Sequence, residues 1–281
     1  MQVSNNQKIF INNGEETKRT TSPQKHVVSA FIPQCPPLKS YPSKDIFAAQ
    51  TKPLTTSLPE KIASNTLDKI YLKALPEKFI AKYANNDFLT KAISNNPQIE
   101  KMLKEEGLNV RIEPQNVTTI ANSHLIPTMK YAKNIMLNSG EYFSPKEYEL
   151  MAQAALIHDL GKALIPSEIL NKKGALSPKE KEIVKLHNDI GYELLKSTDL
   201  SPRVLSMVQN HHGYGNIYPK DSLTQILTIA DVYSALKEKR AYKKAMNDEE
   251  AFKILEQGAN AGDFNINYVT SLKKSLQNKN I

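Results

Sequence analysis

Five of the six histidines in this 281-residue chain have the surroundings of buried helix positions. Each of them lies at helical spacing from apolar residues rather than among charged ones. Two aspartates have similar surroundings, because one directly follows His158 and the other ends the apolar segment 226–230. The set consists of His124, His158, Asp159, His187, His211, His212 and Asp231. These residue types together are typical of a buried metal site.

The number and types of these residues favour a metal site over ordinary hydrogen-bonded core residues. A single inward histidine is usually a core residue with satisfied hydrogen bonds, but five arriving from four helices, with two aspartates, are not explained in that way. Burying an unpaired carboxylate is costly, and a metal ion relieves the cost. Nitrogen-rich sites with two carboxylates suit iron, manganese, zinc or cobalt better than calcium or magnesium. No thiolate accompanies the set, which argues against a structural zinc cluster.

The elements that must position this set begin at clear helix-start signals. Ser144-Pro145 and Ser177-Pro178 each open a capping box with proline at the first helical position, and Ser201-Pro202 repeats its opening half. The helical cores that these signals and the apolar pattern predict are 148–156, 183–195, 204–208 and 223–236. Pairs of extended segments are missing here, so we expect an all-α domain, a helical bundle.

The chain divides by composition into four parts. Residues 1–59 hold seven of the sixteen prolines and many polar residues, which predicts a disordered tail. Residues 60–107 have a helical pattern, with Asn96-Pro97 opening a last short helix that Gly107 closes. We expect this small helical segment to pack against the main domain at 114–258, and residues 259–281 to form a polar C-terminal tail.

Net charge and targeting signals limit the classes of function. The formal charge is +8 and the pI is about 9.2, a balance that attracts anions. The lysines are scattered and not interleaved with aromatic residues, so we expect no dedicated nucleic-acid site. A secretion signal and long apolar segments are missing, and Cys35 is the single cysteine. We therefore expect a cytoplasmic protein without a membrane partner.

The motif His158-Asp159-Leu160-Gly161-Lys162 resembles the signature of the HD superfamily of metal-dependent phosphohydrolases. The longer series resembles the HD-GYP branch, a set of cyclic di-GMP phosphodiesterases. It comprises Pro166, Ile169-Leu170, Gly174, Leu176-Ser177-Pro178, His187, Gly191, His211-His212, Ala230-Asp231, Ala235-Leu236, Arg240 and Tyr242. The resemblance covers about 124–246, less than half of the chain.

This resemblance implies a role for each matching residue. His124, His158, Asp159 and Asp231 resemble ligands of a first metal, and Asp159 bridges to a second metal held by His187, His211 and His212. The implied cofactors are two divalent transition metals, iron or manganese first, with zinc, cobalt or nickel as alternatives. The implied catalytic residues are Asp159 and Lys162. The residues that resemble contacts to the substrate phosphates are Lys162, Arg240, Tyr242 and Tyr218.

The chain departs from the family pattern at four places. The segment from Gly213 to Pro219 is shorter than the family's loop, and its Tyr218-Pro219 lacks the preceding glycine. Ser234 replaces the second acid of the usual Asp-Xaa-Xaa-Asp motif, and Ala241 replaces a proline. Ile120 stands where members with three metals have a glutamate, so we expect two metals rather than three.

Three classes of function remain open from the sequence. The first is hydrolysis of a phosphoester by a metal-activated hydroxide, with a cyclic dinucleotide, cyclic di-GMP foremost, or another nucleotide as substrate. The second is a non-catalytic signalling or scaffold module with a structural metal site, and the third is a nucleic-acid-associated protein. The sequence also leaves open whether the protein forms a homodimer and whether the N-terminal tail binds a protein partner.

Overall fold

The computed structural model describes residues 76–212, 221–239 and 245–277. Within these ranges the regular elements are all helical, which confirms the all-α prediction. The predicted tail at 1–59 and the first part of the helical segment, 60–75, lie outside the described residues. None of the helices described is long and apolar enough to cross a membrane.

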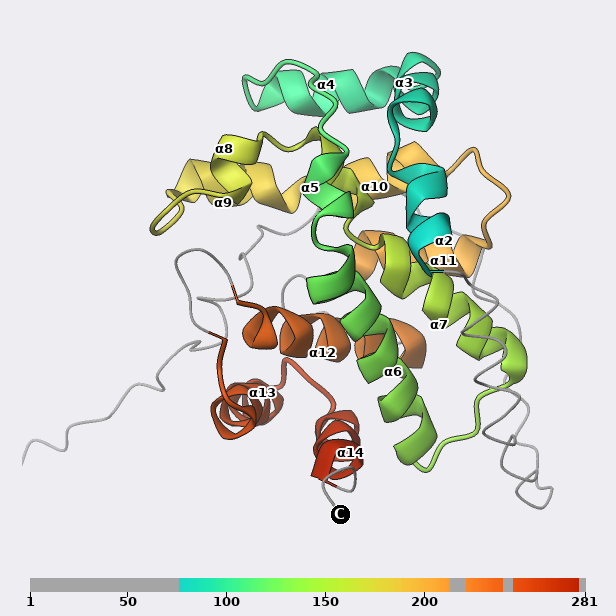
Figure 1. The fold of residues 1–281 in the computed structure, drawn as a ribbon, viewed down its shortest axis with the longest axis vertical. Coiled ribbons are helices and arrows are strands. Elements are labelled where there is room, and N and C mark those ends of the chain that lie inside the picture. Colours follow the sequence, from blue (N-terminus) through green and yellow to red (C-terminus); the bar gives the residue numbers. More distant parts are fainter. Residues whose placement is uncertain (1–75, 213–220, 240–244, 278–281) are drawn as a thin grey trace, which may run out of the picture.

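Three short helices precede the main body and pack on it. They are α2 Pro76–Tyr83, α3 Asn86–Ser94 and α4 Pro97–Glu105. Asn96 caps α4 by accepting a hydrogen bond from the Gln98 N–H, and Gly107 follows the helix with a positive φ of 76°, as its sequence predicts. Helices α3 and α4 lie against one end of the molecule beside α10, whereas α2 contacts α7 (Figure 1).

The main body consists of helices that follow one another through short connections. In chain order they are α5 Gln115–Thr118, the π-helical turn η2 Ala121–Leu125, α6 Ile126–Asn138, α7 Pro145–Ile157, the 3-10 turn η3 Leu160–Leu164, α8 Ser167–Leu170, α9 Pro178–Lys185, α10 His187–Leu195, α11 Pro202–Asn210, α12 Ser222–Lys237, α13 Asp248–Ala261 and α14 Ile266–Gln277. The capping boxes at Ser144 and Ser177 are both formed, so α7 and α9 begin where the sequence predicts.

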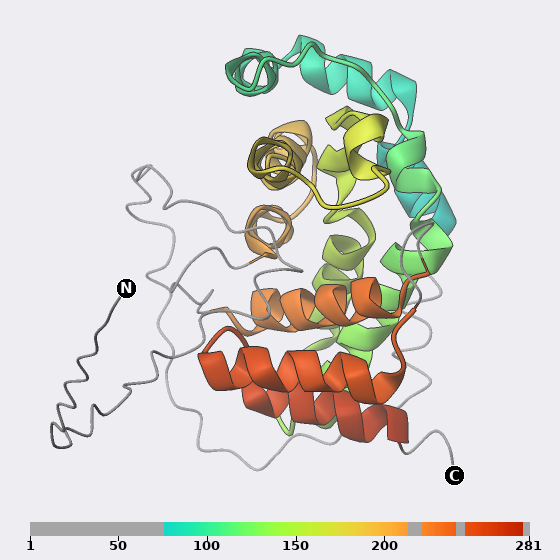
Figure 2. The same cartoon turned by 90° about the vertical axis from the view of Figure 1, so that its left-hand side faces the viewer.

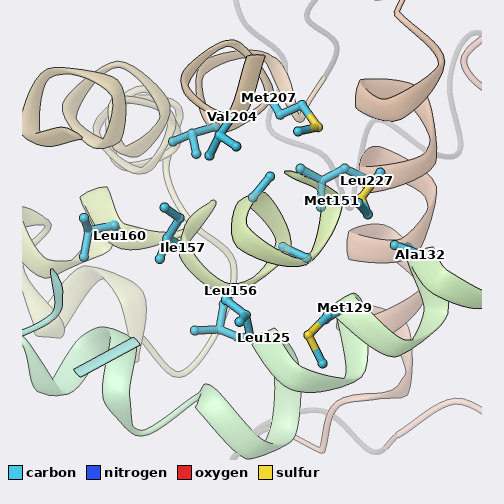
Figure 3. Packing of buried hydrophobic residues seen from close by; sticks show 14 of the residues in the cluster. Leu125, Met129, Ala132, Met151, Leu156, Ile157, Leu160, Val204, Met207 and Leu227 are labelled. Carbon is cyan, nitrogen blue, oxygen red and sulfur yellow. The ribbon is translucent and has the colours of Figure 1, made fainter. Parts of the chain in front are cut away.

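Helix α7 lies at the centre of the hydrophobic core. Its Met151, Leu156 and Ile157 are at most 1% exposed. Leu125 and Met129 surround them from one side, Val204 and Met207 from another, and Leu227 from a third (Figure 3). A helix with apolar residues on all its faces belongs in the interior of a bundle. Because α7 ends at Ile157, it delivers His158 and Asp159 from the middle of the core.

The C-terminal part of the chain differs from the expected polar tail at 259–281. The structure instead contains α14, in which Tyr268, Val269 and Leu272 are buried. Helix α14 packs on α6 and α13, and α12, α13 and α14 lie side by side (Figure 2). The neighbouring polar residues Asn267, Lys273 and Lys274 conceal the apolar residues in the sequence. Tyr268 and Val269 lie four and three residues before Leu272, which is enough to form one buried face.

The predicted helical core at 183–195 is interrupted in the structure. Helix α9 ends at Lys185 and α10 begins at His187, with Leu186 between them. Turn η3 packs closely against α10, and Gly161 is the point of closest approach. A Cβ atom added at Gly161 would lie 2.0 Å from the carbonyl oxygen of His187, so only glycine permits this contact. The contact brings the start of α10 next to Asp159.

Candidate metal centre

His124 is positioned by a π-helical turn rather than by a regular α-helix. Within η2 the N–H groups of both His124 and Leu125 donate to the carbonyl of Ile120, and the Ile126 N–H donates to that of Ala121. Single π turns inside helices occur frequently at functional sites. Here the extra residue turns the His124 side chain inward, where it is 2% exposed.

The other candidate ligands arrive at the ends or along the buried faces of four further elements. His158 and Asp159 join α7 to η3, His187 starts α10, and His211 follows the last residue of α11. Asp231 lies in the middle of α12, whose residues are buried on most sides. The structure therefore brings together all seven residues that the sequence suggests as ligands. Of these, His212 is the most exposed, with 13% of its side chain accessible.

The ligand atoms form two groups that share Asp159. In the first group the Nε2 atom of His124 lies 2.9 Å from Asp231 Oδ1, and that of His158 lies 3.4 Å from the same oxygen. In the second group the Nε2 atom of His187 lies 3.3 Å from that of His211 and 3.2 Å from that of His212.

Asp159 faces both groups with different oxygens. Its Oδ2 atom lies 3.4 Å from His124 Nε2 and 3.5 Å from His158 Nε2. Its Oδ1 atom lies 3.4 Å from His187 Nε2. One carboxylate therefore stands between the two groups, which is the position that the family resemblance implies for a bridging ligand.

Hydrogen bonds to the outer ring nitrogens determine which nitrogen of each imidazole faces inward. The Nδ1 atoms of His158, His187 and His211 lie 2.9, 2.6 and 2.7 Å from the carbonyl oxygens of residues 155, 184 and 208. A carbonyl oxygen only accepts, so Nδ1 carries the proton in all three rings. Their Nε2 atoms consequently offer lone pairs to the centre, as in histidines that bind metals.

These inward nitrogens lack protein donors, and this is the observation that tests whether a metal fits. The Nε2 atom of His158 is buried and has no hydrogen-bond partner among the described residues. The Nε2 lone pairs of His187 and His211 face each other at 3.3 Å, which is repulsive unless a cation lies near both. The ligand atoms of each of three residue triplets lie within 4.8 Å of one another. The set therefore fits divalent metal binding.

The electrostatics of the two groups differ in sign. Burial lowers the pKa of His124, but hydrogen bonds to Asp159 and Asp231 outweigh burial and raise that pKa to about 9. Burial lowers the pKa of His187 to about 3 and that of His212 to about 4, with only partial compensation by the carboxylates. The pKa of His211 is likewise far below its ordinary value because of burial.

Both carboxylates are ionised in this environment. Burial alone raises the pKa of Asp159, but the charge of Lys162 and the surrounding imidazoles hold it well below its usual range. Burial also raises the pKa of Asp231, and its hydrogen bonds with His124 and His158 reverse that effect. A pair of buried anions attracts cations strongly.

Lys162 lies at the edge of the cluster. Its Nζ atom is 2.6 Å from Asp159 Oδ2, and 18% of its side chain is exposed. The ammonium group has three donors, and the bond to Asp159 uses one of them. Lys162 therefore neutralises part of the charge of Asp159 and retains donors for an anion. Arg240, Tyr242 and Tyr218, the other predicted phosphate contacts, lie outside the described residues, as does the shortened loop at 213–219.

The sequence did not identify the residues that brace the loop carrying Lys162. Glu113 accepts hydrogen bonds from the backbone N–H and hydroxyl of Ser167, and its own N–H donates to the carbonyl of Ala163 at 2.8 Å. The Asn116 side chain donates to the carbonyl of Ile165 at 2.9 Å. Glu113 lies just before α5 and Asn116 within it, and a helix of four residues is too short to carry a periodic signal.

In the sequence Ser234 stands out only as a departure from the family pattern, and the structure places its side chain against His124, a candidate ligand. Its Oγ atom lies 3.1 Å from Nδ1 of His124 and 3.0 Å from the His124 carbonyl oxygen. The spacing of three residues from Asp231 was the available signal, because it puts both side chains on one face of α12.

Comparison with known proteins agrees with this arrangement. Residues 121–236 match the family model of the HD domain. The cyclic di-GMP phosphodiesterase response regulator RpfG of Xanthomonas campestris is 35% identical over 124 residues, 40% of this chain and 32% of the relative. A cyclic di-GMP phosphodiesterase of Thermotoga maritima is 28% identical over 201 residues, 66% of this chain and 51% of the relative. The 3'3'-cGAMP-specific phosphodiesterase 2 of Vibrio cholerae is 34% identical over 115 residues, 37% of this chain and 22% of the relative.

A solved structure has the same fold. The HDG"Y"P protein Bd1817 of Bdellovibrio bacteriovorus matches with a TM-score of 0.51 and 16% identity, over 78% of this chain and 75% of that chain. This likeness concerns the fold alone. The chain spans about half or less of the length of the curated relatives that it matches. Residues 121–236 therefore match the HD domain, and this part of the chain is similar to cyclic dinucleotide phosphodiesterases.

Proposed function

We propose that this HD domain is a metal-dependent phosphodiesterase that hydrolyses a phosphoester bond of a cyclic dinucleotide. The observation that carries the proposal is the convergence of buried imidazole Nε2 atoms on two carboxylates, with Asp159 between the two groups. Cyclic di-GMP is the first substrate to test because curated relatives carry that activity in their names, and 3'3'-cGAMP is the second.

In this proposal the seven-residue cluster holds two divalent cations, iron or manganese first. Such a pair of ions supplies Lewis acidity and lowers the pKa of water, which makes a hydroxide available near neutral pH. Asp159 holds the two halves of the cluster at a fixed separation through its two oxygens. The hydrogen bonds on Nδ1 of His158, His187 and His211 fix the ring orientations, so little reorganisation is needed.

Lys162 has a second role, in binding the substrate. Its ammonium group lies beside Asp159 and is partly exposed, so it is able to donate a hydrogen bond to a phosphoryl oxygen entering from solvent. A non-catalytic scaffold would require the metal ligands but not a cation at the open edge of the cluster. The position of Lys162 therefore favours the enzyme over the scaffold.

The test measures hydrolysis by protein loaded with manganese or iron. Substrates are bis(p-nitrophenyl) phosphate, cyclic di-GMP, 3'3'-cGAMP and linear dinucleotides, and the variant is Asp159→Asn. We expect the rate to fall by more than about 100-fold, beyond the range typical of residues that only support a ligand. Metal content, measured by elemental analysis, should fall in the same variant.

Asp248→Asn is the matched control. Asp248 also accepts a hydrogen bond from a lysine at 2.6 Å, but its partner is Lys237 and it lies on α13, outside the cluster. We expect this variant to keep its metal content and rate. Equal rates in wild type and Asp159→Asn would reject the enzyme, and metal binding without turnover of any substrate would favour the scaffold.

A further inference from the structure

We propose that Ser234 is a positioning residue that selects which nitrogen of His124 faces the metal. The inference rests on the proposed metal site and assigns a function to a residue at which this chain departs from the family pattern. Ser234 lies three residues after Asp231 on α12 and is 1% exposed. The two side chains approach His124 from the same helix face, Asp231 at Nε2 and Ser234 at Nδ1.

The single proton of the Ser234 hydroxyl determines the direction of both hydrogen bonds. The hydroxyl oxygen lies 3.0 Å from the carbonyl oxygen of His124, which accepts only, so the hydroxyl proton points there. The same oxygen lies 3.1 Å from the ring Nδ1 atom and therefore accepts from Nδ1–H. With the proton fixed on Nδ1, the Nε2 atom of His124 is the nitrogen available to a cation.

His124 differs from the other rings in where its Nδ1 partner lies. The Nδ1 atoms of His158, His187 and His211 each donate to the carbonyl three residues earlier in the chain. For His124 that carbonyl belongs to Ala121, which accepts the Ile126 N–H of the π turn, whereas the ring Nδ1 atom lies 3.1 Å from Ser234 Oγ. Ser234, on another helix, thus supplies the acceptor for Nδ1 of His124, whereas a nearby backbone carbonyl is the acceptor for Nδ1 of the other three rings.

A carboxylate at position 234 would not reproduce this arrangement. An ionised aspartate has no proton to donate, so its oxygens would face the His124 carbonyl as a second acceptor. Serine satisfies the ring and the carbonyl together, and it does so without adding charge next to two buried carboxylates. A hydroxyl at position 234 therefore suits both groups that it meets, the ring and the carbonyl of His124.

The experiment measures Zn²⁺ affinity of the full chain by competition with a chelating indicator. We expect Ser234→Ala to bind Zn²⁺ about 10- to 100-fold more weakly, the range found when a ligand loses its supporting partner. Ser234→Thr keeps the hydroxyl and should restore affinity close to wild type. Thermal unfolding of the metal-free proteins checks that the variants are folded.

Thr128→Val is the matched control, because the Thr128 hydroxyl donates to the same His124 carbonyl at 2.8 Å but does not contact the ring. If the contact with the ring matters, this variant should keep Zn²⁺ affinity close to wild type. Equal losses in Thr128→Val and Ser234→Ala would mean that the carbonyl alone matters, and would overturn the proposal.

A second readout does not depend on any variant folding. In Zn²⁺-loaded wild type, ¹⁵N NMR of the His124 ring should detect a proton on Nδ1 that exchanges slowly with water, and coordination through Nε2. Coordination through Nδ1 would overturn the proposal. A wild type that binds no Zn²⁺ would instead reject the proposed metal site, whereas unchanged affinity in Ser234→Ala would reject only the role of Ser234.

Discussion

The two halves of the cluster use the same side chain in opposite electrostatic settings. In the Asp231 half, formed by His124, His158 and Asp231, the carboxylates raise the pKa of His124 to about 9. In the tri-histidine half, formed by His187, His211 and His212, burial dominates, and the pKa of His187 falls to about 3. Carboxylates around the ring, rather than depth of burial, decide the outcome, because both rings are at most 2% exposed.

This difference predicts two unequal cation sites. The Asp231 half carries its own carboxylate and shares Asp159, whereas the tri-histidine half has only the share in Asp159. The greater negative charge of the Asp231 half attracts a divalent cation more strongly. In the tri-histidine half, cation affinity depends more on how closely the three Nε2 atoms are held together. Changes to charge should therefore affect the first half most, and changes to backbone position the second.

Gly161→Ala should have the largest effect, by breaking the tri-histidine half. The added methyl group would lie 2.0 Å from the carbonyl oxygen of His187, so α10 must move away from Asp159. Such overpacking typically costs about 1–3 kcal/mol of stability. We expect binding of a second Zn²⁺ to be lost while the first is retained, as measured by titration calorimetry together with thermal unfolding.

Gly191→Ala provides the control for Gly161→Ala. A Cβ at Gly191 would lie 3.1 Å from the Cγ1 atom of Val208, a side-chain atom that moves aside more easily than backbone. This variant should retain both Zn²⁺ ions. Two bound ions in Gly161→Ala would show that the distance between η3 and α10 does not control the tri-histidine half.

Proton release on metal binding sharpens the comparison between the halves. With a pKa of about 9, His124 is protonated in the metal-free protein at neutral pH, so a cation entering the Asp231 half must displace about one proton. Its affinity should rise with pH up to about 9. His187 and His212, with pKa values of about 3 and about 4, are already neutral, so binding to the tri-histidine half should release almost none.

Calorimetry in buffers with different ionisation enthalpies measures these proton numbers at pH 7. The variant His124→Gln serves as the control, because it has no imidazole to release a proton. Equal proton release for the two ions would contradict the electrostatic difference between the halves.

Glu113→Gln should have the smallest effect, because Glu113 supports the loop between the halves without contacting either. The Ser167 hydroxyl lowers the pKa of the Glu113 carboxyl, and burial opposes this only in part. A lowered pKa means that the stabilisation is present above the ordinary pKa and is lost as pH falls through the lowered value. At pH 7 we expect the variant to be less stable by about 1 kcal/mol, the difference between a hydrogen bond to a charged group and one to a neutral group.

Urea unfolding at pH 7 and at pH 3 tests this prediction. The difference between wild type and Glu113→Gln should shrink at the lower pH, because below the ordinary pKa the Glu113 carboxyl binds a proton in the unfolded chain, which favours unfolding of the wild type. A difference that does not change with pH would mean that the charge of Glu113 contributes nothing.

Local sequence signals were sufficient for the starts of α7 and α9. The capping boxes at Ser144 and Ser177 form as predicted because each satisfies its own backbone donors within four residues. The break at Leu186 and the buried face of α14 were not predicted. Both depend on contacts with other elements, η3 in one case and α6 in the other, and those elements are distant in sequence.

The sequence by itself determined the identity of the seven candidate ligands, because residue type and helical spacing are local properties. Only the tertiary structure decided which nitrogen of each imidazole faces inward, since that depends on the oxygen that meets Nδ1. For three rings that oxygen lies three residues earlier in the chain, but for His124 it comes from Ser234, 110 residues away. A hydrogen bond across such a separation exists only once the helices have packed.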